Sequence, residues 1–375
     1  MKYYIIAGEA SGDIHAANLI KEIKLLDNQS QFRVWGGDKM QEQGAVLVKH
    51  YRQLAFMGFY EVIANLRTII RNLKFCKQDI LDYQPDALIL VDYPGFNLRI
   101  AGFAHQKGFK VFYYISPQIW AWKQSRVKKI RKFVDRMYVI LPFEKDFYAN
   151  HNVEVDYVGH PLLDVIENEK SNLPKAVKFR SLNGLNEKPI IALLPGSRKQ
   201  EISKILPEML SVSPFYPDYQ FIIAGAPAIE MDYYHQFIDK SSLKVIYHQT
   251  HALLQNAAAA LVTSGTATLE TALMNVPEVV CYKGNWLSFQ IAKRIVNVKY
   301  ISLVNLIADK PVVTELVQDK LNTSSLKGEL EKILVDENRN RIFRDYAQLR
   351  ELLGNKGASG LAAGLMISRL KSSRL

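Results

Sequence analysis

The chain has two cysteines in 375 residues, and neither belongs to a metal-binding pattern. Cys76 and Cys281 stand far apart without C-x-x-C or Cys/His spacing, so neither a disulfide framework nor a zinc site is expected. No apolar run approaches the ~18 residues of a membrane-spanning helix. The N-terminus reaches Glu9 and Asp13 too early to contain the apolar region of a signal peptide. We therefore expect a cytoplasmic protein.

The composition favours a folded protein with a polyanionic partner. A hydrophobic fraction of 48% and a charged fraction of 23% supply material for large cores, and the length suggests two or three domains. The net charge of +11 suits nucleic acid, an anionic lipid or a phosphorylated substrate. Charge alone does not choose among these.

Strand and helix patterns alternate in two series. The first opens with a strand at Tyr3 to Ala7, a tight Gly-Glu-Ala-Ser-Gly-Asp loop and an amphipathic helix. The second starts with Ile190 to Leu194, after a polar stretch at 172–189 that we interpret as the interdomain connection. The pattern predicts two doubly wound α/β domains that face each other across a cleft and bind ligands at the carboxyl ends of their strands. The predicted boundaries are 1–165, 166–345 and a C-terminal helical segment 346–375, which packs back on the first domain or exchanges between two protomers.

Two loops of the second series are suited to bind phosphate. Ser264-Gly265-Thr266 follows a strand and opens a helix, where small residues and unpaired N–H groups favour an anion, and Glu270 lies one turn further on to accept sugar hydroxyls. The alternative is an ordinary helix cap with a solvated Glu270. The loop at 194–198 offers Arg198 for a bidentate phosphate contact, or else for a surface ion pair. Two such loops in one domain predict a diphosphate site.

Asp92 is the candidate general base. It ends the apolar strand Ala87 to Val91, and a carboxylate at a strand tip beside a cleft can take a proton from an incoming hydroxyl. The alternative is a turn-forming aspartate before Pro94. His248 and His251 have no third ligand nearby, and we interpret them as surface residues.

A basic, apolar face is predicted in the first domain. Apolar residues recur at helical spacing beside a basic stripe that includes Arg67 and Arg71, as in a helix that lies in a membrane interface. These apolar residues are Val62, Ile63, Leu66, Ile69, Ile70 and Leu73. A cluster of cations at 123–132 beside Trp120 and Trp122 also suits the headgroup region. The alternatives are the core side of a helix that packs on the sheet, and a nucleic-acid surface, for which no known motif is present.

Eight motifs in this order resemble the lipid-A-disaccharide synthase family along nearly the whole chain. They are Ala7-Gly-Glu-Ala-Ser-Gly-Asp13, Leu54-Ala-Phe-Met-Gly58 with Glu61-Val62, Tyr114-Ile-Ser-Pro-Gln-Ile-Trp-Ala-Trp122, Leu141-Pro-Phe-Glu-Lys145, Val158-Gly-His-Pro161, Leu193-Leu-Pro-Gly-Ser-Arg198, Ser264-Gly-Thr-Ala267 with Glu270, and Val304-Asn-Leu306. The resemblance implies a GT-B fold and an inverting transfer of 2,3-diacylglucosamine from its UDP derivative to 2,3-diacylglucosamine 1-phosphate. The product would be the β-1,6-linked lipid A disaccharide 1-phosphate, with release of UDP.

The resemblance also implies roles for individual residues. Asp92 matches the proposed base, although Gly95 stands where many members have a second aspartate. Positions expected around UDP are Ser197, Arg198, Ser264, Gly265, Thr266, Glu270, Asn305 and Gln318. Glu9, Ser11 and Asn97 would line the acceptor side, and Val62, Ile63, Leu66, Ile69 and Ile70 match a patch linked to membrane association. The first domain would bind the acceptor and an anionic membrane surface, the cytoplasmic face of the inner membrane. The second domain would bind the UDP-sugar donor. The protein could also form a homodimer.

The chain contains no Asp-x-Asp tripeptide, through which many glycosyltransferases hold a sugar diphosphate by a metal. We therefore expect no metal and no cofactor, with helix N-termini and basic groups stabilising the leaving diphosphate. Two rival functions are also compatible with the sequence. A UDP-N-acetylglucosamine 2-epimerase shares the two-domain plan without a membrane patch, and a non-catalytic lipid- or nucleic-acid-binding protein would explain the charge alone.

Overall fold

The computed structural model describes residues 1–53, 66–121, 124–238, 243–284 and 299–372, and the chain forms two compact units. Unit 1 comprises Met1–Asp164 and Asn355–Leu375, and unit 2 comprises Val165–Gly354. The change of unit falls within helix α8 (Pro161–Lys170) rather than in the polar stretch 172–189. That stretch contains helix α9 (Ala176–Asn183), which buries Phe179 in the core of unit 2, so our interpretation of it as the interdomain connection was wrong.

Unit 1 is built on a seven-stranded sheet in which every pairing is parallel, in the order β3-β2-β1-β4-β5-β6-β7. The strands are β1 (Lys2–Ala7), β2 (Gln31–Gly36), β3 (Val46–His50), β4 (Ala87–Val91), β5 (Lys110–Tyr114), β6 (Arg136–Val139) and β7 (Val155–Tyr157). All five residues of β4 are buried, as expected for a central strand that helices cover on both faces.

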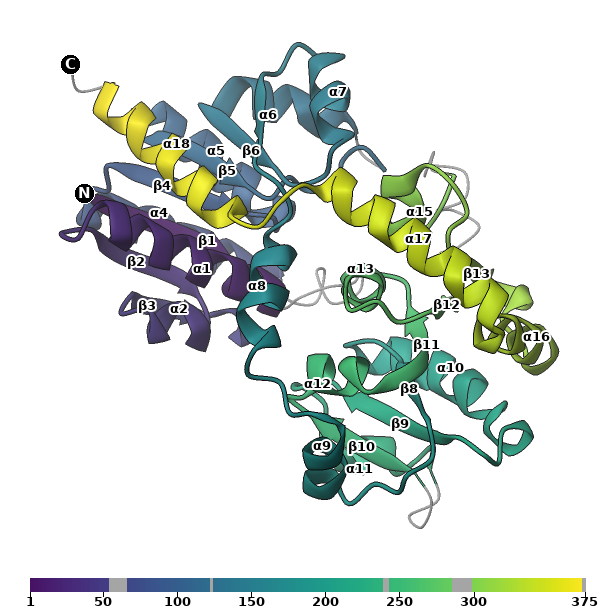
Figure 1. Cartoon of the computed structure of the whole chain (residues 1–375). Helices are drawn as coiled ribbons and strands as arrows, with labels where there is room; N and C mark the ends of the chain where they lie inside the picture. Colours follow the sequence, from purple (N-terminus) through teal and green to yellow (C-terminus); the bar gives the residue numbers. More distant parts are fainter. Residues whose placement is uncertain (54–65, 122–123, 239–242, 285–298, 373–375) are drawn as a thin grey trace. The chain divides into compact units, whose positions relative to one another are not determined.

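Helices flank this sheet (Figure 1). They are α1 (Ala10–Leu26), α2 (Asp38–Glu42), α4 (Leu66–Tyr83), α5 (Pro94–Gln106), α6 (Val127–Phe133), α7 (Glu144–Ala149) and the C-terminal α18 (Ala358–Ser372). The last of these packs against α1, so the two ends of the chain belong to the same unit. The preceding residues Tyr346–Leu353 remain in unit 2 as the end of α17.

Unit 2 repeats the plan with a six-stranded parallel sheet in the order β10-β9-β8-β11-β12-β13. Its strands are β8 (Ile190–Leu194), β9 (Gln220–Gly225), β10 (Lys244–Tyr247), β11 (Ala257–Thr263), β12 (Glu278–Tyr282) and β13 (Thr314–Val317). Besides α9, its helices are α10 (Lys199–Leu210), α11 (Met231–Tyr234), α12 (Thr250–Gln255), α13 (Thr266–Leu273), α15 (Leu303–Ala308), α16 (Thr323–Leu334) and α17 (Asp336–Leu353). Both units are thus doubly wound, as the alternating sequence pattern predicts.

Glu278, at the start of β12, is expected to make stability depend on pH. Its carboxyl group is fully buried, and neither oxygen has a hydrogen-bond partner among the described residues. Burial raises the pKa of this carboxyl well above its ordinary value, so the folded protein keeps a proton that the unfolded chain releases at about pH 4. Stability therefore falls as the pH rises from that point toward the folded-state pKa. The Glu278→Gln variant should have a melting temperature about 2–5 °C above that of wild type at pH 8. At pH 4 the two melting temperatures should be close. Equal melting curves at pH 8 would contradict the proposed effect of the buried carboxyl group.

Candidate active site

The unit 1 residues of the predicted site meet where the strand order reverses. Glu9 follows β1 and Asp92 follows β4, and these neighbouring strands lead to connections on opposite sides of the sheet. Ligands of doubly wound folds bind in the crevice at such a switch point. Glu9 and Asp92 are partly buried and close enough to interact electrostatically, while Ser11 is exposed in the first turn of α1. The structure thus brings the predicted base next to a second carboxylate.

The backbone of Asp92 is held in a left-handed conformation that few residues adopt. Asp92 and Tyr93 have φ angles of 41° and 48°. The Asp92 carbonyl accepts hydrogen bonds from the Asn97 amide (2.8 Å) and the Tyr113 hydroxyl, and its N–H donates to the carbonyls of Tyr114 and Ile115. Asn97 itself is fully buried and also donates to the Val91 carbonyl (3.1 Å). Its amide therefore fixes the Asp92 turn.

The environment of Asp92 changes its acidity. Burial raises the pKa of its carboxyl to about 7, and the negative charge of Glu9 adds to the increase. The ordinary value is 3.8, so the shift brings this group into the range where it exchanges protons near neutral pH. A carboxylate with such a pKa is suited to general base catalysis.

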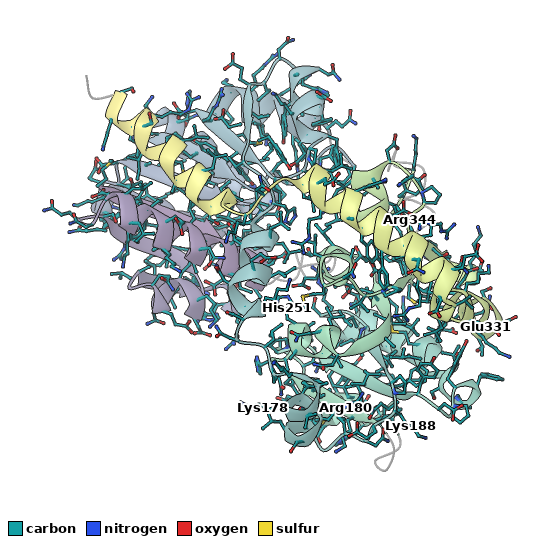
Figure 2. The ribbon with its side chains drawn as sticks, in the orientation of Figure 1. Lys178, Arg180, Lys188, His251, Glu331 and Arg344 are labelled. Atoms are coloured by element: carbon teal, nitrogen blue, oxygen red, sulfur yellow. The ribbon has the colours of Figure 1, made fainter. Side chains whose placement is uncertain are left out.

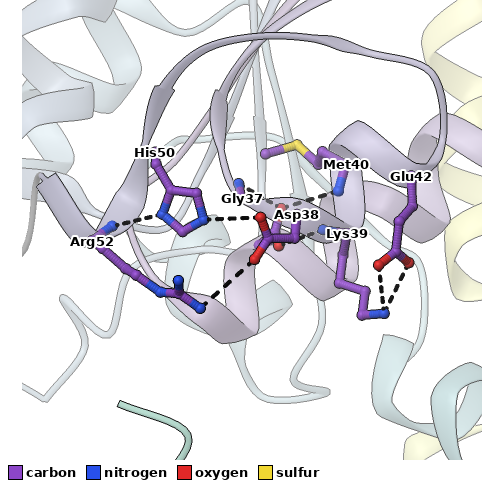
Figure 3. A network of polar contacts seen from close by, with 8 residues as sticks. Gly37, Asp38, Lys39, Met40, Glu42, His50 and Arg52 are labelled. Carbon is purple, nitrogen blue, oxygen red and sulfur yellow. Dashed lines mark hydrogen bonds and ion pairs between the residues drawn. The ribbon is translucent and has the colours of Figure 1, made fainter.

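Asp13 fixes the loop that carries Glu9, a role that the sequence analysis did not assign. Its buried carboxylate accepts three backbone N–H groups, from Gly37 (2.8 Å), Lys39 (3.0 Å) and Met40 (3.2 Å), at the start of α2. Figure 3 shows this part of the structure, in which Asp38 also pairs with His50 (3.4 Å) and Arg52 (3.7 Å). Asp13, in the first turns of α1, thereby ties the start of that helix and the Gly8-Glu9 loop before it to the end of β2.

The same loop approaches β4 closely. A Cβ atom added to Gly8 would lie 2.4 Å from the ring of Tyr93, which is closer than any side chain could tolerate. Glycine at position 8 therefore lets the backbone after β1 pack directly on the turn that follows Asp92.

In unit 2, the predicted phosphate loop opens helix α13 at the end of β11. Gly265 and Thr266 are exposed, and no side chain caps the helix at Gly265. Gly265 has a φ of 154°, which only glycine adopts readily, and a Cβ added there would meet nothing within 4 Å. Ser264 donates its hydroxyl to the Ile301 carbonyl (2.8 Å), so it braces the loop and does not cap the helix. The first N–H groups of α13 are thus arranged as in helix N-termini that bind anions.

The second predicted loop follows β8, the neighbour of β11 at the switch point of this sheet. Ser197 and Arg198 are exposed there. Glu201 in the first turn of α10 accepts the Ser197 N–H (3.1 Å) and lies 3.6 Å from the Arg198 guanidinium. An anionic group therefore already occupies one side of this loop, beside a guanidinium that is half exposed.

Asn305 and Gln318, the remaining predicted residues, differ in their surroundings. Asn305 is buried, and its amide donates to the Val313 carbonyl and to Glu315 while its oxygen accepts the Val313 N–H. These bonds tie α15 to Val313 and Glu315 at the start of β13. Gln318 directly follows β13 and has a φ of 55°, and its Nε2 has no partner among the described residues.

His251 is not the surface residue that the sequence analysis predicted. It belongs to α12 (Figure 2), and its imidazole is only 10% exposed. Nδ1 lies 2.5 Å from Glu169 Oε2, and Nε2 lies 3.3 Å from Glu270 Oε1. The histidine therefore contacts the carboxylate that the sequence predicts for sugar hydroxyls. The sequence did not reveal that His251 contacts Glu169, because the two residues are 82 positions apart.

Part of the predicted membrane patch is exposed on helix α4. Leu66 is 50% and Ile70 is 47% exposed, and Ile69 is partly buried. The buried residues of this helix are instead Asn72, Cys76, Asp79 and Ile80, so Leu66 and Ile70 are not on the core side. Val62 and Ile63 lie outside the described residues, as does Trp122.

Trp120 was expected at a headgroup region and is buried instead. It is 9% exposed and packs edge-on against Phe143, with ring centroids 4.9 Å apart. Of the described cations that follow it, Lys128, Lys129, Arg131 and Lys132 are exposed and Arg126 is partly buried. In its described residues, the cluster therefore presents cations at the surface while Trp120 is buried.

Solved structures with the same fold include sugar-nucleotide epimerases and glycosyltransferases. The UDP-GlcNAc 2-epimerase of Methanocaldococcus jannaschii, in complex with UDP-GlcNAc and UDP, has a TM-score of 0.70 at 14% identity and covers 98% of this chain and 100% of its own. The calicheamicin glycosyltransferase CalG4 has a TM-score of 0.61 at 13% identity, with 98% of each chain covered. Such low identities show the fold alone, that of two Rossmann-like domains in the GT-B arrangement of elements.

Sequence relatives are more specific. The lipid-A-disaccharide synthetase family model matches residues 3–366. The lipid-A-disaccharide synthase of Trichlorobacter lovleyi is 39% identical over 377 residues, covering 98% of this chain and 97% of the relative. That of Geobacter sulfurreducens is 38% identical over 374 residues, covering 98% and 96%. The epimerase alternative is not favoured by these matches, and the chain belongs to the lipid-A-disaccharide synthase family of glycosyltransferases.

Proposed function

We propose that the protein transfers 2,3-diacylglucosamine from UDP-2,3-diacylglucosamine to the 6-hydroxyl of 2,3-diacylglucosamine 1-phosphate. The products are the β-1,6-linked lipid A disaccharide 1-phosphate and UDP. Family membership supports the class of reaction. The observation that carries the mechanism is Asp92, a partly buried carboxylate at the end of β4 whose pKa is raised to about 7.

Asp92 acts as the base in a single in-line displacement. As the acceptor oxygen forms its bond to C1 of the donor sugar, the bond from C1 to the UDP oxygen breaks and the electron pair leaves with UDP. The hydroxyl proton passes to the Asp92 carboxylate. Attack opposite to the leaving group inverts the anomeric carbon, so one base is sufficient. Glu9 and Ser11 line the acceptor side, and Asn97 holds the Asp92 turn through its amide.

Unit 2 binds the donor. The N–H groups of α13 at Gly265 and Thr266, together with Ser197 and Arg198, stabilise the diphosphate, whose negative charge grows as the bond breaks. Glu270 accepts ribose hydroxyls, and Gln318 offers its amide to the nucleotide. Asn305 contributes by tying α15 to the start of β13. Since the chain lacks an Asp-x-Asp motif, a chelator is expected to leave the rate unchanged.

The rate is expected to depend on pH through Asp92. The base acts only when ionised, so kcat/KM should rise about tenfold per pH unit below the pKa and level off above it. With the Asp92 pKa at about 7, the midpoint falls near neutral pH. Glu9→Gln removes a charge that raises this pKa, so the midpoint should move to lower pH. If the variant keeps the wild-type midpoint in its pH–rate profile, the Glu9 charge does not influence the pKa of Asp92 as proposed.

The α4 surface is proposed to hold the enzyme on the anionic cytoplasmic face of the inner membrane, where its acylated substrates reside. In the described part of the chain, no helix has the length and apolarity to cross a bilayer. Exposed Leu66 and Ile70 alternate with exposed cations such as Arg67 and Arg71, as in interfacial helices.

Replacing Leu66 and Ile70 together with serine is expected to weaken binding to vesicles of anionic phospholipid about a hundredfold or more, since each inserted side chain contributes roughly 1.5–3 kcal/mol. The melting temperature should stay close to wild type, because both side chains are exposed. Vesicle sedimentation measures the binding. Leu25→Ser with Leu361→Ser, on exposed positions of α1 and α18, is the matched control and should bind vesicles normally. Unfolding of the α4 variant, or normal vesicle binding by it, would contradict the patch.

The function is tested by incubating the protein with UDP-2,3-diacylglucosamine and 2,3-diacylglucosamine 1-phosphate in the presence of chelator. Formation of the disaccharide phosphate with one UDP per product is the expected result. Release of a sugar epimer without disaccharide would favour the epimerase, and no turnover would overturn the proposed transferase activity.

A further inference from the structure

We propose that His251 is a positioning residue for the donor: it holds the Glu270 carboxylate in the orientation that accepts the ribose hydroxyls of a nucleoside diphosphate sugar. This inference rests on the proposed function, which assigns Glu270 to the donor. It adds a residue of α12 to a site that the sequence motifs place on the loops after β8, β11 and β13.

The imidazole of His251 lies between two carboxylates, one at each ring nitrogen. Nδ1 is 2.5 Å from Glu169 Oε2, and Nε2 is 3.3 Å from Glu270 Oε1. Both nitrogens can donate to carboxylates only when both carry protons, so the ring is a cation. Burial alone would lower the pKa of His251, but the hydrogen bonds to Glu169 and Glu270 outweigh it and raise the pKa to about 9. The two contacts and the raised pKa together make the ring a donor at both nitrogens at neutral pH.

The contact leaves room for a ligand at Glu270. His251 engages Oε1, and the Glu270 side chain keeps 27% of its area exposed. Glu270 lies in the helix whose exposed N-terminus, at Gly265 and Thr266, is suited to bind phosphate. A ribose attached to a bound diphosphate would reach a carboxylate one turn along the same helix. Fixing one oxygen of that carboxylate removes the rotamer freedom that ligand binding would otherwise have to restrict.

The elements that carry the three side chains are themselves braced. Arg350 of α17 donates to the Leu273 carbonyl at the end of α13 (2.9 Å) and pairs with Glu167 of α8 (3.2 Å). On the other side, the Gln249 side chain before α12 exchanges hydrogen bonds with Asn183. Hydrogen bonds thus hold the elements on both sides of the histidine, as positioning a carboxylate requires.

The test is UDP binding by calorimetry together with donor kinetics for His251→Gln, which keeps a hydrogen-bond donor but not the charge. We expect the Kd for UDP and the donor KM to rise about tenfold, as for loss of one charge-assisted hydrogen bond, with kcat at saturating donor within about twofold of wild type. Glu169→Gln, which loosens the histidine from its other side, should weaken UDP binding in the same direction by a smaller factor. His235→Gln removes an imidazole that pairs with exposed Asp232 at 3.7 Å, and should leave UDP binding unchanged.

A double-mutant cycle separates positioning from general stabilisation. In a Glu270→Gln background, His251→Gln should weaken UDP binding no further, because the carboxylate through which it acts is gone. Additive effects, or wild-type UDP binding by folded His251→Gln, would overturn the role of His251. If wild type transfers the sugar and binds UDP, and the His251 and Glu169 variants bind UDP with the same affinity, only the role of His251 is refuted. If wild type neither binds UDP nor forms disaccharide, the proposed function fails with it.

Discussion

Replacing Asp92 with asparagine is expected to lower kcat by about 10²- to 10⁴-fold, the usual contribution of a general base. The amide has the shape of the carboxylate but cannot take the hydroxyl proton. Asparagine also tolerates the left-handed backbone at this position, where φ is 41°, so the turn held by Asn97 should remain intact. UDP affinity, measured by calorimetry, should not change, because the donor is assigned to residues of unit 2.

Gly95 supplies the control for this prediction, since the resemblance to the family implies a second aspartate at this position. Gly95 is exposed in the first turn of α5, and a Cβ added to it would meet nothing within 4 Å. A carboxylate near a helix N-terminus is favourable, so Gly95→Asp should fold and keep its activity. The double variant Asp92→Asn, Gly95→Asp should remain inactive. Recovery of turnover in that double variant, or near-normal turnover of Asp92→Asn alone, would remove Asp92 from the role of base.

The central strands were predictable because buried strands appear in the sequence as continuous apolar runs. Strands β4 and β8 are five-residue apolar runs in which each residue is buried, and the sequence pattern places both. The edge strands β3, β7 and β13 were not predicted. β3 and β7 contain only partly or fully exposed residues, and β13 buries a single residue, so none is the fully buried apolar run that is typical of a central strand. Their pairing comes from the neighbouring strand rather than from their own composition.

The candidate site divides in a similar way. Loops at strand ends that carry Asp92 or Gly265 could be found in the sequence, because small and polar residues after an apolar run indicate them directly. The roles of Asn97 and Asn305 could not, since both are polar residues that are buried against backbone groups. His251 was misassigned for a related reason: its partners come from α8 and α13, which only the fold brings to α12. Polar residues at a site are recognisable by type, but their partners depend on tertiary structure.

Gly265→Val is expected to weaken UDP binding about a hundredfold, the loss of roughly two hydrogen bonds from backbone N–H groups to a charged ligand. Valine disfavours a φ of 154°, and its branched side chain would stand beside the first N–H groups of α13. The fold should tolerate the change at a cost of about 1–3 kcal/mol, because a Cβ there meets nothing within 4 Å. Calorimetric titration with UDP measures the affinity, and thermal unfolding measures the cost.

Gly328→Ala is the matched control, because a Cβ at Gly328 also meets nothing within 4 Å, but this glycine lies inside helix α16. It should bind UDP like wild type and gain up to about 1 kcal/mol of stability from the higher helix propensity of alanine. Both glycines have room for a side chain, but only Gly265 lies at the N-terminus of α13. A substitution should therefore affect UDP binding only at Gly265. Wild-type UDP affinity in folded Gly265→Val would mean that the diphosphate does not bind at this helix N-terminus, and the proposed mechanism would lose its means of stabilising the leaving group.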